Sequence, residues 1–463
     1  MTSQGKGTTR WSLSMMLCAF AFVFAAVVMA ANNTPTDPGP REGNAGAGGR
    51  IAGLTVKEGK FFDTGLDQFE EVQSVDGSVA GTEEGLGPRF NSNSCVSCHA
   101  HPAAGGTSPK DNPQVIMANM LGPTQQQQLS TLTSLGIISP TGPVREVRFA
   151  SDGGVHYLFT IADLDGARGC APSQPDFSGH LGELKFRIPT PLFGLGLIEA
   201  IEDATILDNV HGGKPFGILG IANRNGNDGT VTRFGWKAQN KSLVIFSGEA
   251  YNVEQGVTNE LFPDERGEAG MPDAEACYRV RPAPQDTVNY DLTQPQQVID
   301  NINAFANFMR FLAPPTPVTS YTGSLTKQQI TQAQIDAGKT AFNTAGCNIC
   351  HTPSMTSGSH FTAALANKTV NLFSDLLLHD IGTGDGISQG GANENQFRTA
   401  PLWGVGQRLF FLHDGRTANI VEAIKAHGGE ATEVVKNFTG AAGASKPLTA
   451  TESQNLVNFL RSL

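Results

Sequence analysis

Apolar residues recur at helical spacing in three stretches of the chain. The clearest is Thr451–Leu463, which places four apolar side chains on one helical face: Leu456, Val457, Phe459 and Leu460. Further helices are predicted from about Thr326 to Thr344 and around Phe61–Val75. We expect the C-terminal helix to pack through its apolar face against the helix at 326–344.

The region between about residues 105 and 320 has a different pattern, in which short apolar runs alternate with glycine, proline and asparagine. This pattern predicts helices embedded in long loops, with a few short strands. The proline-rich segment Ala313–Pro317 then marks a domain boundary. The sequence therefore predicts a mainly α protein with an N-terminal domain at 51–320 and a C-terminal domain at 326–463.

Residues 1–30 have the pattern of a secretory signal peptide, which predicts export to the periplasm. Lys6 and Arg10 precede an apolar run from Leu13 to Met29, and small residues follow it. The run borders on the length needed to cross a bilayer, so an uncleaved membrane anchor is the alternative. Residues 31–50 are rich in proline, glycine, alanine and asparagine, and are expected to form a flexible linker.

Each of the two domains contains the five-residue pattern Cys-x-x-Cys-His. The copies are Cys95-Val96-Ser97-Cys98-His99 and Cys347-Asn348-Ile349-Cys350-His351. This pattern attaches c-type haem: two thiols one helical turn apart form thioethers to the porphyrin, and the adjacent imidazole binds the iron. The sequence therefore predicts two covalently bound c-type haems, with His99 and His351 as iron ligands.

Zinc binding and dithiol redox chemistry are the alternatives for these cysteines. The cysteine pairs of a zinc site usually lie within a few tens of residues, whereas roughly 250 residues separate the two motifs. A redox dithiol needs neither the following histidine nor a second copy. Of the other cysteines, Cys18 lies in the signal region, and Cys170 and Cys277 are expected to form a disulfide unless they are two separate buried thiols.

A weak internal repeat follows the two motifs. Pro191–Gly196 is similar to Pro401–Gly406, and an arginine precedes each copy, Arg187 and Arg398 respectively. This placement is expected if one haem-binding unit was duplicated. The sequence thus predicts two cytochrome c-like haem domains, the N-terminal one enlarged by loop-rich insertions with a few short strands.

Charge restricts the partners of the chain. The formal net charge is -11, and charged residues make up only 16% of the sequence. No basic face is present that can follow a phosphate backbone, so nucleic acid is not an expected partner. A small basic redox protein fits the acidic balance better, because opposite charges steer association.

The second axial ligand decides whether a haem only transfers electrons or also binds a small molecule. After His351 the only methionine is Met355, which is too close in sequence to reach the opposite face of the haem. The candidates for the C-terminal haem are therefore histidines: His360, His379, His413 and His427. His427 is favoured, because it ends a predicted helix at 420–427 that two glycines terminate.

No spacing rule selects a second ligand for the N-terminal haem. The candidate side chains are His156, His180, His211, Met117 and Met120. An open iron with polar residues above it is equally compatible with the sequence.

Several further stretches resemble the di-haem oxidoreductase family, within the bacterial di-haem cytochrome c peroxidase superfamily. These stretches are Gly85–Asn91, Pro191–Ala200, Phe234–Ala238, Ser374–Asp380 and Arg398–Ala431. The resemblance implies an oxidoreductase with peroxidase-like activity and a small soluble electron-donor protein, a cytochrome or cupredoxin. It also implies a calcium ion between the haem domains as a further cofactor.

The resemblance implies roles for single residues as well. In the superfamily the distal ligand of the C-terminal haem is usually a methionine, and the corresponding position here is His427. The N-terminal haem is the peroxide site, assisted by a glutamate, and the segment Val253–Gly256 looks similar to that of the peroxidases. Glu254 is therefore the candidate general acid–base. Trp236 and Trp403 are candidates for an electron relay between the haems or for ordinary core packing.

These observations favour a periplasmic di-haem oxidoreductase that passes electrons from a donor protein through one haem to hydrogen peroxide at the other. A non-enzymatic di-haem electron carrier, and an oxygen-using or protein-modifying relative, are the alternatives. The coordination of the N-terminal iron discriminates between them, because catalysis needs an open or displaceable position.

Overall fold

The computed structural model describes residues 34–160, 174–210, 214–263, 286 and 300–463. The signal region 1–30, Cys170, Cys277 and His211 lie outside the described residues, so the signal peptide and the disulfide stay predictions. None of the helices in the described part has the length and hydropathy needed to span a bilayer.

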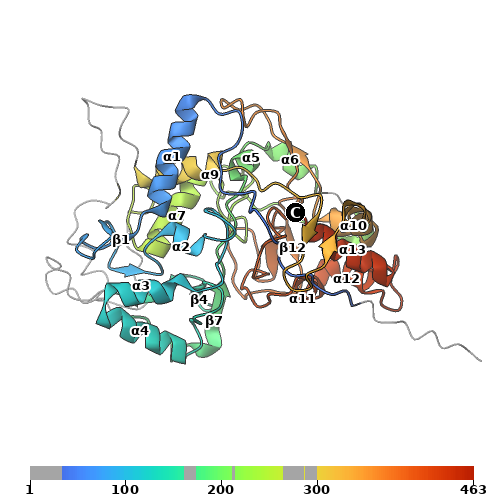
Figure 1. Ribbon diagram of the computed structural model, residues 1–463. Coiled ribbons are helices and arrows are strands. Elements are labelled where there is room, and N and C mark those ends of the chain that lie inside the picture. Colours follow the sequence, from blue (N-terminus) through green and yellow to red (C-terminus); the bar gives the residue numbers. More distant parts are fainter. Residues whose placement is uncertain (1–33, 161–173, 211–213, 264–285, 287–299) are drawn as a thin grey trace, which may run out of the picture. The chain divides into compact units, whose positions relative to one another are not determined.

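The motif segment Cys95–Cys98 is an α-helix that contacts the helix Val56–Glu70 (Figure 1), and Cys347–Ile349 is a 3-10 helix that contacts the helix Gln332–Ala345. The α-helices are α1 Val56–Glu70, α2 Cys95–Cys98, α3 Pro113–Leu121, α4 Pro123–Ser134, α5 Leu195–Glu199, α6 Asp203–Leu207, α7 Leu243–Gln255, α9 Asn301–Phe311, α10 Gln332–Ala345, α11 Ile420–Lys425, α12 Thr432–Thr439 and α13 Ala450–Leu460. Short 3-10 helices are η1 Leu181–Glu183, η2 Pro215–Gly217, η3 Cys347–Ile349 and η4 Gly429–Ala431.

The described strands are short and form small separate sheets. They are β1 Gln73–Ser74, β2 Glu83–Glu84, β3 Arg89–Phe90, β4 Glu146–Phe149, β5 Val155–His156, β6 Phe159–Thr160, β7 Leu184–Arg187, β8 Tyr321–Thr322, β9 Gln329–Ile330, β10 Met355–Thr356, β11 Thr369–Val370, β12 Leu378–Asp380 and β13 Gln396–Arg398. The largest described sheet has the order β5-β4-β7 and is antiparallel throughout, with Val147 paired to both His156 and Phe186. Helices with a few short strands agree with the expected fold class.

The first residue of several helices is determined by capping residues, which locate it more exactly than the spacing of apolar residues does. A capping box begins α1, α10 and α13, formed by the pairs Thr55/Glu58, Thr331/Gln334 and Thr449/Glu452. The expected helix at 326–344 therefore begins later, at Gln332, because residues 329–330 pair with β8 as strand β9. The helix expected around 61–75 lies earlier in the chain, at 56–70.

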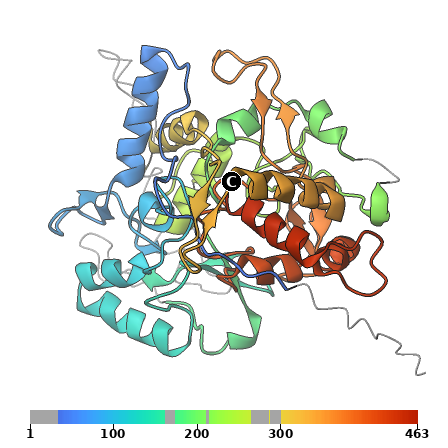
Figure 2. The ribbon, with the colours of Figure 1, turned by 45° about the vertical axis from the view of Figure 1, so that its right-hand side comes forward.

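Two helix pairs form the frame of the molecule. α1 packs against α9, and α10 packs against α13, which confirms the predicted packing of the last helix (Figure 2). Each pair crosses at a glycine: a Cβ atom on Gly65 would lie 2.3 Å from the carbonyl oxygen of Ala304, and one on Gly338 would lie 1.9 Å from that of Asn455. Only a residue without a side chain allows the helices to approach so closely.

The internal repeat makes the same contacts in both halves. A Cβ atom on Gly196 would lie 1.9 Å from the carbonyl oxygen of Arg310, and one on Gly406 would lie 2.3 Å from that of Arg461. The two arginines occupy equivalent places. Arg310 is six residues after Ala304, the residue at which α9 meets Gly65, and Arg461 is six residues after Asn455, the residue at which α13 meets Gly338. The six-residue similarity in sequence thus corresponds to a shared packing arrangement.

The two repeats also contact each other reciprocally. A Cβ atom on Gly194 would meet the ring of Trp403 at 2.5 Å, and one on Gly404 would meet the ring of Phe193 at 3.7 Å. Equivalent residues therefore exchange roles across the contact, as they do across a two-fold axis. Trp403 takes part in this packing.

The hydrophobic cores do not follow the predicted domain boundary. The first core contains buried residues of α1, α5, α7 and α9, but also residues between Met355 and Leu377 from the predicted C-terminal domain. The second core joins α10, α11, α12 and α13. The C-terminal part thus contributes a segment to the core of the N-terminal part.

The expectation of a flexible linker is wrong for residues 34–50. Asp37 is buried and forms an ion pair of 2.7 Å with Arg461, at the end of α13. The backbone N–H of Arg41 donates to the carbonyl of Gly406. The composition resembled that of a linker, but a buried carboxylate with a buried guanidinium partner anchors the segment.

Candidate haem sites

Each Cys-x-x-Cys-His motif lies on the wall of its own cavity. The first cavity has a volume of about 1150 Å³ including its open mouth and is lined by Cys95, Cys98 and His99. The second has a volume of about 1300 Å³ and is lined by Cys347, Cys350 and His351. All four thiols are free, as a bond to another group requires.

The histidine of each motif is oriented in the same way. Nδ1 of His99 donates to the carbonyl oxygen of Gly106 at 3.0 Å, and Nδ1 of His351 donates to that of Phe373 at 2.9 Å. This tautomer places the lone pair of the ring on Nε2, as in metal-binding histidines held by a backbone carbonyl. Burial lowers the pKa of both imidazoles to about 4, so both rings are neutral and can act as ligands.

Two arginines that the sequence analysis did not assign to a site also line the second cavity. Arg398 and Arg408 are buried, and burial lowers their pKa to about 10, so they stay charged at neutral pH. Arg398 donates to the carbonyls of Gly235 and Thr399, whereas Nη2 of Arg408 has no hydrogen-bond partner among the described residues. A buried cation needs an anionic partner, and the carboxylate groups of a haem fit this requirement.

Three of the four candidate histidines for the C-terminal haem line the second cavity. They are His379, His413 and His427, whereas His360 stacks on Phe361 away from the cavity. His427 follows α11, which ends at Lys425, two residues before the predicted end. Its Nδ1 donates to the carbonyl of Ala423 at 2.8 Å, so its Nε2 carries the lone pair, as in the two motif histidines.

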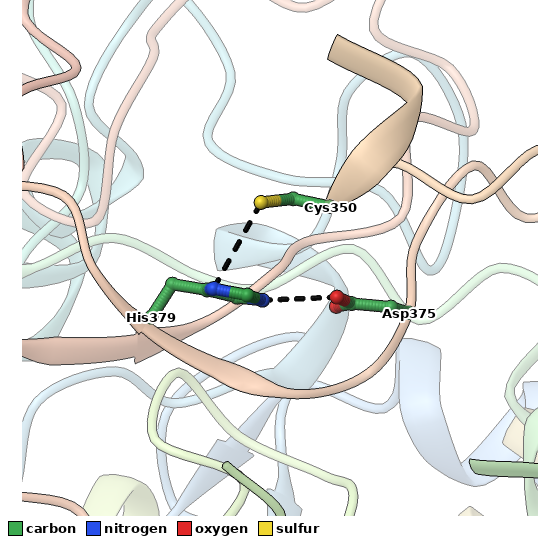
Figure 3. A group of neighbouring side chains, drawn as sticks. All are labelled: Cys350, Asp375 and His379. Atoms are coloured by element: carbon green, nitrogen blue, oxygen red, sulfur yellow. Dashed lines mark hydrogen bonds and ion pairs between the residues drawn. The ribbon is translucent and has the colours of Figure 1, made fainter. Parts of the chain in front are cut away.

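His379 is held by two carboxylates. Nε2 lies 2.9 Å from Oδ2 of Asp375, and Nδ1 lies 3.0 Å from Oε2 of Glu430. Nδ1 also lies 3.8 Å from Sγ of Cys350, which places this group beside the second Cys-x-x-Cys-His motif (Figure 3). Burial alone lowers the pKa of His379, but the hydrogen bonds to the acidic partners raise it to about 12. The ring is therefore a cation without a lone pair for iron.

His413 lies over an aromatic ring on the same wall. It stacks on Phe397 with ring centroids 4.1 Å apart, and burial lowers its pKa to about 4. Its edge faces Trp236 at 6.5 Å. Among the described histidines of this cavity, His427 thus has the geometry most similar to that of the motif histidines.

The first cavity differs from the second in its side chains. His99 is the only histidine among the described residues that line it, and Met309 the only methionine. His156 and His180 stack on Phe149 instead. Neither Met117, which is buried in a separate core, nor Met120 lines the cavity. Of the candidate second ligands, His211 alone lies outside the described residues.

Glu254 lines this first cavity. It lies in the last turn of α7, which Gly256 ends in a left-handed conformation with φ 68°. Asn91 holds it twice: the backbone N–H of Asn91 donates to the carbonyl of Glu254 at 2.7 Å, and its Nδ2 donates to Oε2 at 3.1 Å. Burial, together with the neighbouring carboxyl of Glu146, raises the pKa of Glu254 to about 8.

A family model with the description "di-haem oxidoreductase, putative peroxidase" matches residues 180–463. The chain belongs to this di-haem oxidoreductase family. Membership implies two haems, and the two cavities described above are where the chain offers ligands for them. No curated protein sequence matches the oxidoreductase.

The oxidoreductase is also similar to solved structures, at low scores. A MauG-like protein associated with microbial copper homeostasis shares 16% identity, with a TM-score of 0.27, over 59% of this chain and 90% of the other. A variant of the diheme peroxidase BthA from Burkholderia thailandensis shares 12% identity, with a TM-score of 0.26, over 67% of this chain and 93% of the other. Similarities of this size add nothing to the functional argument.

Trp236 of the oxidoreductase lies on the wall of both cavities. Its Nε1 donates to the carbonyl of Ile188 at 2.9 Å, which holds the indole ring in place. Trp403 lines neither cavity and packs against Gly194 instead. The structure therefore separates two tryptophans that the sequence analysis treated alike.

Among the described residues, one group of side chains has the spacing of a metal site, but it does not fit calcium. The group consists of Cys350, Asp375 and His379. Calcium takes oxygen ligands, whereas this group offers a sulfur and a protonated imidazole. The calcium ion implied by the resemblance therefore has no support in this group.

Proposed function

We propose that the protein is an exported, peroxidase-like di-haem oxidoreductase with both haems attached through the motif cysteines. The second cavity would hold the haem that receives electrons from a small donor protein. The first cavity would hold the haem at which hydrogen peroxide is reduced. The contrast between the cavities carries this proposal: the second offers His427 as a further ligand, and the first offers Glu254.

The position of Trp236 supports electron transfer between the two haems. Its ring borders both cavities, so it bridges the space between them with a polarisable aromatic system. His413 and Phe397, stacked beside it, extend the aromatic contact along the second cavity. In this proposal Trp236 is the relay and Trp403 is a packing residue.

Peroxide reduction needs proton transfer as well as electrons. A haem bound in the first cavity would supply a redox-active iron that accepts peroxide. Glu254 would take a proton from the peroxide and return it to the leaving oxygen, which departs as water. Asn91 would orient the carboxyl for both transfers through its two hydrogen bonds.

Replacing Glu254 with glutamine tests the catalytic assignment. We expect peroxide turnover to fall by about 10²–10⁴-fold, because an amide of the same shape cannot accept and return a proton. The haem content should stay unchanged, as measured by absorbance per mole of protein. The exposed Glu84→Gln is the control and should turn over peroxide at the normal rate; undiminished turnover in Glu254→Gln would contradict the assignment.

Replacing His427 with alanine tests the axial ligand of the C-terminal haem. We expect electron paramagnetic resonance of the oxidised protein to lose one low-spin signal, because the iron loses a strong-field ligand. His360→Ala, which changes a histidine outside the cavity, should leave the spectrum unaltered. An unaltered low-spin signal in His427→Ala would eliminate the ligand. In the unsubstituted, oxidised protein, low-spin signals from both irons would favour the electron-carrier alternative.

A further inference from the structure

The first cavity contains a second glutamate beside the proposed catalytic one. Glu146, at the start of β4, and Glu254, at the end of α7, both line the cavity, and their carboxyl groups are close enough to influence each other. Two ionised carboxylates have only acceptor atoms, so a hydrogen bond between them requires a proton on one of them. This proximity therefore favours a state in which the two groups together hold a proton.

The neighbours of each carboxyl decide which one carries this proton. Nε of Arg148 lies 2.6 Å from Oε1 of Glu146, and the side chain of Arg148 is only 7% exposed. This pairing favours the ionised form of Glu146. Glu254 accepts a hydrogen bond from the side-chain amide of Asn91, which carries no charge to stabilise a carboxylate. The geometry thus places the charge on Glu146 and the proton on Glu254.

The pKa shifts agree with this division. Burial, then repulsion by Glu146, raises the pKa of Glu254 to about 8. Burial acts in the same direction on Glu146, but the charges of Arg148 and Arg187 outweigh it and lower its pKa. Arg187 is in turn held by Asp385, at 2.6 Å.

Other ionisable groups near the pair come from each neighbouring element. They are Glu249 of α7, Arg145 immediately before β4, His99 and the thiols of Cys95 and Cys98 at α2, and Arg89 of β3, a strand that packs against α7. Burial raises the pKa of both thiols, so they add no charge at neutral pH. Arg148 therefore has the direct role in setting the charge of the pair.

We propose that Glu146 and Glu254 form one proton-sharing unit, in which Glu254 holds the proton and Arg148 keeps Glu146 ionised. The resting site then contains an acid and a base at once. This resting state does not depend on the proposed peroxidase function, but its use in catalysis does. The residues around Glu254 resemble those of the peroxidases, whereas nothing in the sequence around Glu146 marks it as part of a site.

With peroxide as substrate, the pair balances the proton transfers. Peroxide gives one proton to the singly protonated pair, which then holds two. Breaking the O–O bond returns one of them to the departing oxygen, which leaves as water. Complete reduction to two waters consumes two electrons from the reduced donor protein and two protons from solvent. Peroxide thus gives its proton through Glu254, whose own proton passes to the ionised Glu146, and Glu146 is protonated only until Glu254 has returned a proton to the departing oxygen.

Infrared spectroscopy of the haem-loaded, full-length protein tests the unit without any turnover. The signal is the carbonyl stretch of a protonated carboxyl, identified by its shift in deuterated water and followed against pH. We expect a band at neutral pH that is lost near pH 8 and is missing in Glu254→Gln. In Glu146→Gln the repulsion is removed, so the acid dissociation constant of Glu254 should rise about tenfold or more and the band should vanish at lower pH.

Arg148→Met provides a variant with the opposite expectation. Without the guanidinium the pair is harder to ionise, so the band should persist to higher pH than in the unsubstituted protein. Shifts in opposite directions cannot arise from a general loosening of the fold. A band unaffected by Glu254→Gln, or shifts of the same sign in both other variants, would overturn the proposal. If the two variants show these opposite shifts but the unsubstituted protein reduces no peroxide, the proposed function fails and the proton-sharing unit stands.

Discussion

Replacing Cys95 and Cys98 together with alanine is expected to remove one covalently bound haem and to abolish peroxide turnover, while the second haem stays attached. The two thiols lie on the wall of the first cavity and on no part of the second, so the attachment sites are independent. Without thioethers, denaturation should release the haem from the first cavity. Intact mass spectrometry and haem staining of the denatured protein measure the number of haems that stay with the chain.

A matched pair of variants makes this result specific. Ser97→Ala changes the same motif but keeps both thiols. It removes the hydrogen bonds of Ser97 to Ser92, to the carbonyl of Ser94 and to Sγ of Cys98, and it should retain two haems. Cys347→Ala/Cys350→Ala should also lose one haem, this time from the second cavity. Retention of both haems by either double-cysteine variant would show that the motif is not an attachment site.

Replacing Lys237 with methionine is expected to lower the free energy of unfolding by about 3–5 kcal/mol, because it breaks a buried ion pair from one side. The side chain is fully buried, and Nζ lies 3.2 Å from Oδ1 of Asp385. Nζ also donates to the carbonyls of Asn393 and Gln396, each at 2.9 Å. Methionine fills similar space but removes one of the two cations beside Asp385, which keeps Arg187, and one donor from each carbonyl.

Urea unfolding of the haem-loaded protein measures this loss as a lower midpoint at unchanged slope. Lys436→Met is the control, because Lys436 forms an exposed ion pair of 3.4 Å with Glu433, one helical turn away. An exposed pair of this kind contributes at most about 1 kcal/mol. Equal midpoints for the two variants would show that Asp385 and the carbonyls find other partners when Lys237 is removed.

Local features of the fold were predictable from the sequence because neighbouring residues produce them. The apolar face of the last helix needs only residues within three turns, and its packing against α10 is confirmed. The repeat at Pro191–Gly196 and Pro401–Gly406 could be recognised in the sequence. In the structure, the last glycine of each copy packs against the carbonyl of an arginine, Arg310 or Arg461. The same local reasoning failed for residues 34–50, because Asp37 pairs with a residue at the other end of the chain.

The partners of the catalytic candidate were not predictable in this way. Glu146 lies on a short strand far from Glu254 in sequence, and nothing in the residues around it marks it as part of a site. Arg398 and Arg408 were likewise ordinary basic residues until their burial in the second cavity was known. The only related signal in the sequence is the low share of charged residues, 16%. It indicates that charges are scarce, but not which of them are buried in a site.

By itself the sequence predicted where haem is attached, because the thiols and the imidazole of each motif are within one turn of each other. It also determined the family and the main helices. The tertiary structure alone decided which side chains face each cavity, which histidine keeps a lone pair, and that Trp236 rather than Trp403 borders both sites. The reason is physical: covalent attachment needs only neighbours along the chain, whereas protonation and ligation depend on groups that folding brings together from distant segments.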